Sequence, residues 1–143
     1  MERNAIEAVV RQLRPGPYGW RCELPTPVRF FGQPVELVVD TRPVRDDKPP
    51  PALAPAEVEL VRLILDGLPE VLTECERQYY RCIAEFPELF GKAHGPQIWV
   101  SREWPGDGPP GDWSFSVGIA GAPGWGIHCE FRGLKLQRSW FGD

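Results

Sequence analysis

Residues 113–140 read WSFSVGIAGAPGWGIHCEFRGLKLQRSW, and the pattern of this stretch constrains the architecture more than any other part of the chain. Apolar and polar residues alternate over 113–119, 127–132 and 134–140, which is the two-residue period of half-buried strands. Only short, glycine-containing segments separate these runs. Short connections join antiparallel neighbours, so with a further alternating run over 97–104 they predict a four-stranded C-terminal meander.

Upstream of the meander, apolar residues recur at helical spacing. Ile6, Val9, Val10 and Leu13 form one stripe over residues 3–13. A longer helical pattern runs over 55–86 and is interrupted at Gly67-Leu68-Pro69, because a proline cannot donate the backbone hydrogen bond that a helix interior needs. We therefore expect an N-terminal helix and two consecutive helices in the middle of the chain.

Two apolar runs between the helical segments predict a hairpin, because Val28–Phe31 and Val35–Asp40 flank Gly32-Gln33-Pro34. Clusters of proline and glycine predict loops at 15–27, 43–55, 105–112 and 121–126. The expected class is α+β, with an antiparallel sheet (N-terminal hairpin plus C-terminal four-stranded meander) packed against two or three helices. None of the loops has the length of an interdomain linker, so we expect residues 1–143 to form a single domain.

The composition excludes several classes of protein. The net charge of −4 disfavours a nucleic-acid-binding protein, which needs a basic surface to meet phosphates. The first residues do not resemble a signal peptide, and no apolar run is long enough to cross a membrane. The four cysteines form no C-x-x-C pair and are typical of reduced thiols. We therefore expect a cytoplasmic protein that does not bind membranes.

His128 and Glu130 are the candidate catalytic residues. They lie two positions apart on one strand, so their side chains share its polar face and could form an acid–base pair. A turn at Arg132-Gly133 would instead place Glu130 opposite Lys135 as an ordinary cross-strand charge pair, with His128 opposite Gln137. We favour this simpler interpretation.

Cys75 and Cys82 lie seven positions apart on the apolar stripe of the predicted second middle helix. Zinc sites usually show closer paired spacing, and a metal here would need ligands from elsewhere, such as His94. Cysteine on an apolar stripe behaves as a small hydrophobe, so we expect core packing and no metal. Gly124-Trp125-Gly126 lacks the third glycine and the strand–helix context of a dinucleotide fingerprint, so no cofactor is expected.

Tryptophan supplies the most informative functional signal. We expect Trp113 and Trp140 on the inward face of the sheet. Trp99 alternates out of phase with its apolar neighbours, and Trp125 lies in a glycine-rich loop, so these two are the candidate binding residues. Exposed tryptophans are frequent anchors of protein interfaces. The alternative for Trp99, that the N-terminal segment covers it, stays open.

The order of these elements resembles that of small bacterial α+β domains without assigned roles. The resemblance is carried by Phe30-Phe31-Gly32, by Tyr79-Tyr80 at the end of the helical middle, and by the meander from Trp113 to Asp143. In being small and acidic the chain also resembles immunity proteins that neutralise bacterial toxins. That resemblance implies an inhibitor of a cognate protein and no catalytic residues.

From these observations we expect a non-enzymatic protein-binding domain. Two alternatives from other classes remain. The first is a small hydrolase-like enzyme that uses the polar sheet face around His128 and Glu130. The second is a homodimer joined through a face or an edge of the sheet.

Overall fold

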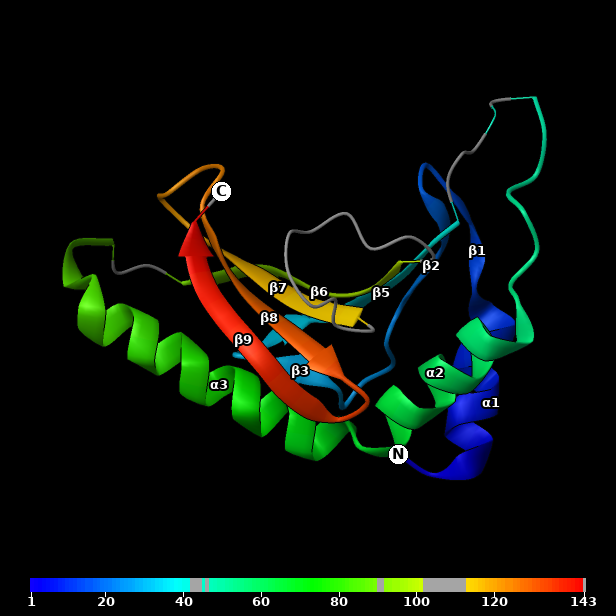
Figure 1. The fold of residues 1–143 in the computed structure, drawn as a ribbon, viewed down its shortest axis with the longest axis horizontal. Helices are drawn as coiled ribbons and strands as arrows, with labels where there is room; N and C mark the ends of the chain where they lie inside the picture. Colours follow the sequence, from blue (N-terminus) through cyan, green and yellow to red (C-terminus); the bar gives the residue numbers. More distant parts are fainter. Residues whose placement is uncertain (42–44, 46, 90–91, 102–112, 143) are drawn as a thin grey trace.

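The computed structural model describes residues 1–41, 45, 47–89, 92–101 and 113–142, so Trp104 and the predicted loop at 105–112 lie outside the described residues. Within these described residues, three helices, a short 3₁₀ turn and nine strands follow one another (Figure 1). Their bounds are α1 Arg3–Gln12, β1 Arg14–Gly16, β2 Gly19–Glu23, β3 Arg29–Phe30, β4 Gln33–Pro34, β5 Glu36–Asp40, α2 Pro55–Asp66, α3 Leu68–Glu85, the 3₁₀ turn Pro87–Leu89, β6 Ala93–Ser101, β7 Trp113–Ile119, β8 Gly126–Arg132 and β9 Lys135–Gly142.

Seven of the strands form one sheet in the order β1-β2-β5-β6-β7-β8-β9. Every neighbouring pair is antiparallel except β5 and β6, which are parallel and are connected through the α2–α3 helical segment. The predicted α+β class and the C-terminal meander of β6–β9 are therefore confirmed.

The predicted N-terminal hairpin is present but shorter than predicted. Only Arg29–Phe30 and Gln33–Pro34 pair across the turn, as the small two-stranded sheet β3–β4. The longer strand β5 pairs instead with β2, which lies in the segment 15–27 that we predicted as a loop. The prolines of that segment misled the prediction, because they flank β2 or lie on the edge strand β1, where a missing N–H is tolerated.

The helices begin and end where the sequence signals predict. Glu57 accepts a hydrogen bond from the Ala54 backbone N–H at 2.7 Å and so caps the start of α2. The helical run breaks at Gly67, and Pro69 falls in the first turn of α3, where its missing N–H costs nothing. None of the helices in the described part of the chain is long and apolar enough to cross a membrane.

All three helices lie on one side of the sheet (Figure 1), and the core fills the space between the two layers. Trp113 stacks on Phe131 with ring centroids 4.5 Å apart, and its indole N–H donates to the Gly133 carbonyl at 2.7 Å. Phe30 packs against both Tyr79 of α3 and Phe115 of β7, which joins the small hairpin to the core. None of the helices in the described residues lies over the opposite side of the sheet (Figure 1).

A bulge between β8 and β9 overturns two predicted placements. The turn lies at Gly133-Leu134, since Arg132 pairs with Lys135, and the register then shifts by one residue at Glu130/Phe131. An extra residue on one strand reverses the faces of all residues beyond it. Trp140 therefore lies opposite His128 and is exposed, whereas the sequence predicted it on the inward face.

Candidate functional site

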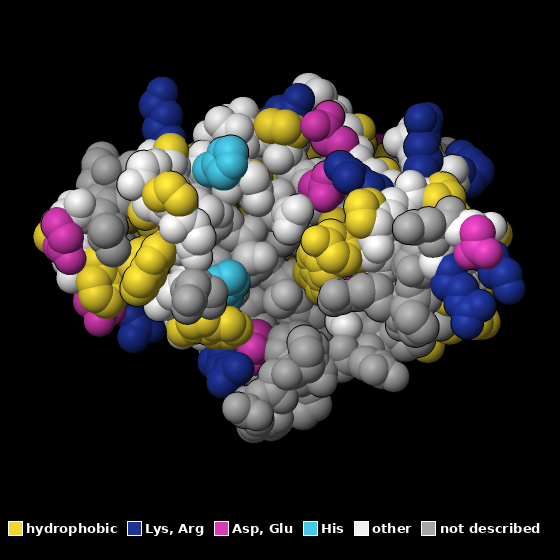
Figure 2. Space-filling view, turned by 90° about the horizontal axis from the view of Figure 1, so that it is seen from above, with side chains coloured by type: hydrophobic (Ala, Val, Ile, Leu, Met, Phe, Trp, Pro, Cys, Tyr) yellow, Lys and Arg dark blue, Asp and Glu magenta, His cyan; other side chains and the backbone are white. Residues whose placement is uncertain are grey.

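The candidate site is the side of the seven-stranded sheet that faces away from the helices, which we call the open face. Cross-strand partners bring its side chains together, because Gln97, Ser116 and His128 follow one another across β6, β7 and β8. Two residues further along each strand, Trp99, Ser114 and Glu130 do the same. Figure 2 looks onto this side and shows a hollowed surface with both histidines, charged pairs and apolar side chains around it.

Glu130 is the most deeply buried charged group on the open face, with 1% of its surface exposed. Arg138 of β9 lies opposite and donates two hydrogen bonds to its carboxylate, at 2.7 and 2.9 Å. The predicted Glu130–Lys135 pair is therefore wrong, because the turn places Lys135 opposite Arg132 and the bulge then places Arg138 opposite Glu130. Both carboxylate oxygens already hold a charged partner, which leaves Glu130 poorly placed to serve as the partner of a general base.

His128 has two neighbours on β9, Trp140 and Gly142. Its ring stacks on Trp140 with centroids 4.9 Å apart, and its Nε2 is 3.3 Å from the Gly142 carbonyl oxygen. Trp140 lies opposite His128, where the sequence predicted Gln137. His128 and Ser116 do line a pocket, but its volume of about 240 Å³ is below the usual range of small-molecule sites. A catalytic role for His128 with Glu130 stays a prediction.

Trp125 forms the outer wall of that same pocket, at the end of the sheet. It lies in the β7–β8 loop, as predicted, and 48% of its surface is exposed. Its ring contacts Phe141 of β9 with centroids 5.3 Å apart, so the exposed indole is held in place and is not a free loop tip. A held, exposed aromatic ring can enter an interface at little entropic cost.

Trp99 is half-buried on the open face, and its neighbour is Tyr18, with ring centroids 5.1 Å apart. Tyr18 belongs to the β1–β2 turn, so the N-terminal segment covers part of Trp99. The two rings line a second pocket, of about 300 Å³. Sequence reasoning missed Tyr18 because the whole segment 15–27 was predicted as a loop; an aromatic residue between Pro17 and Gly19 was the available signal.

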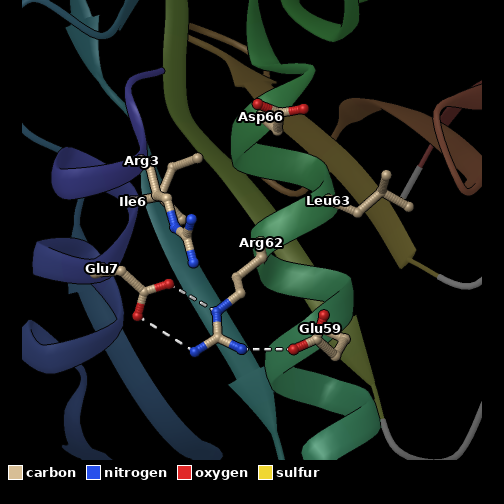
Figure 3. A pocket seen from close by; sticks show the side chains of 7 residues that line it. All are labelled: Arg3, Ile6, Glu7, Glu59, Arg62, Leu63 and Asp66. Carbon is tan, nitrogen blue, oxygen red and sulfur yellow. Dashed lines mark hydrogen bonds and ion pairs between the residues drawn. The ribbon is translucent and has the colours of Figure 1, made fainter.

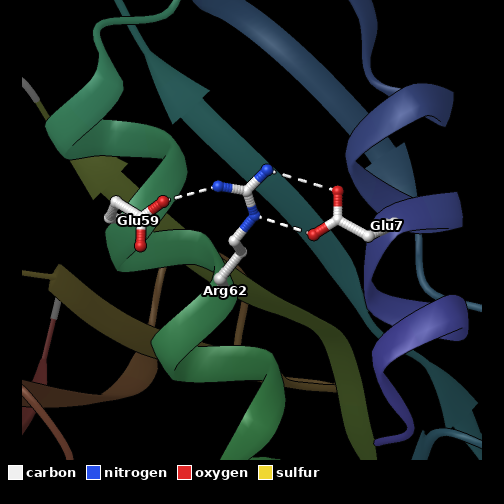
Figure 4. Close-up of polar contacts among 3 residues, drawn as sticks. All are labelled: Glu7, Glu59 and Arg62. Atoms are coloured by element: carbon white, nitrogen blue, oxygen red, sulfur yellow. Dashed lines mark hydrogen bonds and ion pairs between the residues drawn. The ribbon is translucent and has the colours of Figure 1, made fainter.

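A third hollow, between α1 and α2, is lined by charged side chains (Figure 3). Arg62 of α2 donates to both oxygens of Glu7 at 2.8 and 3.2 Å and to Glu59 at 2.5 Å (Figure 4). The hydrogen bonds from Arg62 lower the pKa of Glu7, and the two carboxylates raise the pKa of Arg62, mainly through Glu7. This cluster ties the two helices together, and the hollow is wide and shallow in shape.

A second group of exposed aromatic side chains lies on the helix side. Phe31 has a positive φ of 48°, which is unusual for a bulky residue, and its ring contacts Tyr79 and Tyr80 of α3 at 4.8 and 5.4 Å. These contacts hold the β3–β4 turn against the helix. We take this group as structural, and Tyr80 serves below as a control.

The cysteines show no reactive thiol. Burial raises the pKa of Cys75, which packs near Cys129, and burial together with Glu36 raises the pKa of Cys22 to about 11. Cys82 is half-buried, and its pKa is raised as well, mainly by burial. In the described part of the chain no three His, Cys, Asp or Glu side chains converge to hold a metal ion.

Comparisons of the chain with family models, with curated proteins and with solved structures find no match.

Proposed function

We propose that this chain is a non-enzymatic protein-binding domain and that the open face of its sheet is the contact surface. The observation that carries the proposal is the set of accessible aromatic rings on and around this face. Tyr18, Trp125 and Trp140 are exposed, and Trp99 is half-buried beside Tyr18. Tryptophan and tyrosine are the residues most enriched at the energetic centres of protein interfaces.

The polar groups between these rings suit a protein partner better than a small apolar ligand. Ser114, Ser116, Gln97 and His128 offer hydrogen-bond donors and acceptors on a broad surface. The pockets beside them, about 240 and 300 Å³, are the size of single side chains or a few of them. A face of this kind would receive several side chains of one partner at once.

The charge of the chain selects the kind of partner. With a net charge of −4, the domain attracts proteins with a basic contact surface and repels acidic ones, which raises the association rate for the former. An inhibitor of the immunity type, which covers the functional surface of a cognate protein, is the role we propose for this binding. It rests on the acidic charge and on the layout of the chain.

The proposal is tested by capture followed by measured affinities. The immobilised protein is exposed to lysate of its source cells, the retained protein is identified by mass spectrometry and purified, and its affinity is measured by calorimetry. Trp125→Ala and Trp99→Ala are expected to weaken binding by about tenfold or more each. Circular dichroism checks that both variants are folded.

Tyr80→Ala and Leu63→Ala are the matched controls, because both remove an exposed apolar side chain from the helix side. They are expected to bind as the unaltered protein does. Wild-type affinity in both tryptophan variants, or a loss of affinity in Tyr80→Ala alone, would contradict the proposal.

A further inference from the structure

We infer that the pocket lined by Tyr18 and Trp99 binds a positively charged side chain, a lysine or an arginine, presented by the partner protein. The inference rests on the proposed function and specifies one contact within it. We call this pocket the aromatic corner; it comprises the two rings together with Val38, Glu36, Gln97 and Arg21.

Three neighbouring elements build the aromatic corner. Arg21 of β2, Val38 of β5 and Trp99 of β6 are consecutive cross-strand partners, so Val38 lies between the other two. Tyr18 extends from the β1–β2 turn to Trp99, and the two rings meet at 57°. Val38 points to the open face and lines the pocket, yet it is only 4% exposed. The two rings contact each other and form one side of the pocket, and most of the surface that lines it is polar.

Exposed faces of aromatic rings attract cations. The face of each ring carries a partial negative charge, and an ammonium or guanidinium group near it gains more as water is excluded. The CH₂ groups of a lysine or arginine side chain would lie along the exposed ring of Tyr18 while the charged end reaches the rim. A neutral apolar side chain would gain no electrostatic attraction from the ring faces or from Glu36.

The rim of the aromatic corner supplies the counter-charge. Glu36 accepts hydrogen bonds from Arg21 at 2.6 Å and from Gln97 at 3.2 Å, with 27% of its side chain exposed. The carboxylate thus already binds one guanidinium group, that of Arg21, which is itself half exposed. A cation that enters the pocket either shares Glu36 with Arg21 or displaces it.

A single substitution, at Arg21, can distinguish a site for cations from a site for anions. Arg21 is the one cationic side chain among the residues that line the pocket in the described part of the chain. Its removal frees Glu36 and should tighten the binding of a cation, whereas it would abolish the binding of an anion. The sign of the change identifies the ligand class.

The test is a titration of ¹⁵N-labelled protein with N-acetyl-arginine amide, N-acetyl-lysine amide and the neutral isostere N-acetyl-citrulline amide. The readout is the indole N–H signal of Trp99, assigned with Trp99→Phe. Both cationic probes should shift this signal, with the citrulline probe about fivefold weaker or more, which is the order of an exposed cation–π contact with a counter-charge.

Substitutions of the residues that line the pocket should change its affinity for the cationic probes in opposite directions. Arg21→Gln should bind the cationic probes severalfold more tightly, and Glu36→Gln and Tyr18→Ala severalfold more weakly. Glu23→Gln is the matched control, because Glu23 is the cross-strand partner of Glu36 and lies outside the pocket, so it should change affinity by less than about twofold. A pocket variant that does not fold is recognised by its NMR spectrum. In that case the affinity of Glu36→Gln for the cationic probes decides whether the inference holds.

Equal binding of the citrulline probe, no shift of the Trp99 signal, or weaker binding in Arg21→Gln together with a shift caused by inorganic phosphate would each overturn the inference. If N-acetyl-arginine amide competes with the captured partner, the partner supplies the cation. If it binds without competing, the pocket takes a free amine and the inference about the partner is wrong. If the probes fail while Trp125→Ala still loses the partner, only this inference fails and the proposed function stands.

Discussion

The pair Glu130–Arg138 offers the sharpest test of the register that the bulge creates. Truncation by Arg138→Ala leaves a carboxylate that is 1% exposed without its two hydrogen bonds. Breaking a fully buried ion pair costs about 3–5 kcal/mol. Arg138 is half exposed, so water can reach part of the vacated space, and we reduce the expected cost to about 2 kcal/mol, the range of a hydrogen bond to a charged group.

The assay is urea unfolding followed by tryptophan fluorescence, with thermal unfolding in parallel. A loss of about 2 kcal/mol corresponds to a melting temperature lower by about 6 °C in a chain of this length. Lys135→Ala is the matched control, because it removes the cation that the sequence pattern places opposite Glu130, and it should change stability by less than about 0.5 kcal/mol. A larger effect of Lys135→Ala than of Arg138→Ala would refute the register and the argument built on it.

Three further predictions follow from single residues. Gly19→Ala should cost about 3 kcal/mol in urea unfolding, since Gly19 has φ of 146° and an added Cβ would lie 2.4 Å from a backbone carbonyl oxygen; Gly121→Ala, with positive φ but open space, should cost about 1 kcal/mol. Arg62 lowers the pKa of Glu7, so the unaltered protein should be more stable than Glu7→Gln at neutral pH. This difference should vanish as the pH falls below 4.5, the ordinary pKa of glutamate, because Glu7 is then protonated in both the folded and the unfolded state. A difference in stability that stays unchanged in acid would contradict the Glu7–Arg62 ion pair. The pKa of Cys22 is about 11, against an ordinary 9.0, so iodoacetamide should alkylate it about 100-fold more slowly than a free thiol at neutral pH. Mass spectrometry measures the rate of labelling, and a rate equal to that of a free thiol would refute the burial of Cys22.

The parts of the fold that local pattern determines were predictable. Alternation over 113–140 identified the strands of the meander, and Gly67 with Pro69 identified the break between α2 and α3. These signals are local, because side-chain period and backbone chemistry act within a few residues.

The parts that depend on distant pairing were not predictable. β2 became a strand by pairing with β5, despite the prolines on both sides of it. The extra residue in β9 could not be read from the alternation, and it moved Trp140 from the core to the surface. Register is set by which strands meet, and that information is spread over the whole chain.

The candidate site shows the same division. Trp99 and Trp125 were identified from their context, one by its phase and the other by its glycine-rich loop. Tyr18, which forms half of the aromatic corner, was not, because its contact with Trp99 crosses β5 and joins residues far apart in the sequence. Glu130 was assigned the wrong partner for a different reason, because the position of the β8–β9 turn and the bulge could not be derived from the alternation.

The central claim is that a partner protein covers the open face of the sheet, and a binding footprint tests it most directly. With the captured partner added to ¹⁵N-labelled protein, the indole signals of Trp99 and Trp125 and the amide signals of β6–β8 should shift or broaden. Signals from the exposed sides of α2 and α3 should not. A footprint confined to the helices, with both indoles unchanged, would contradict the account.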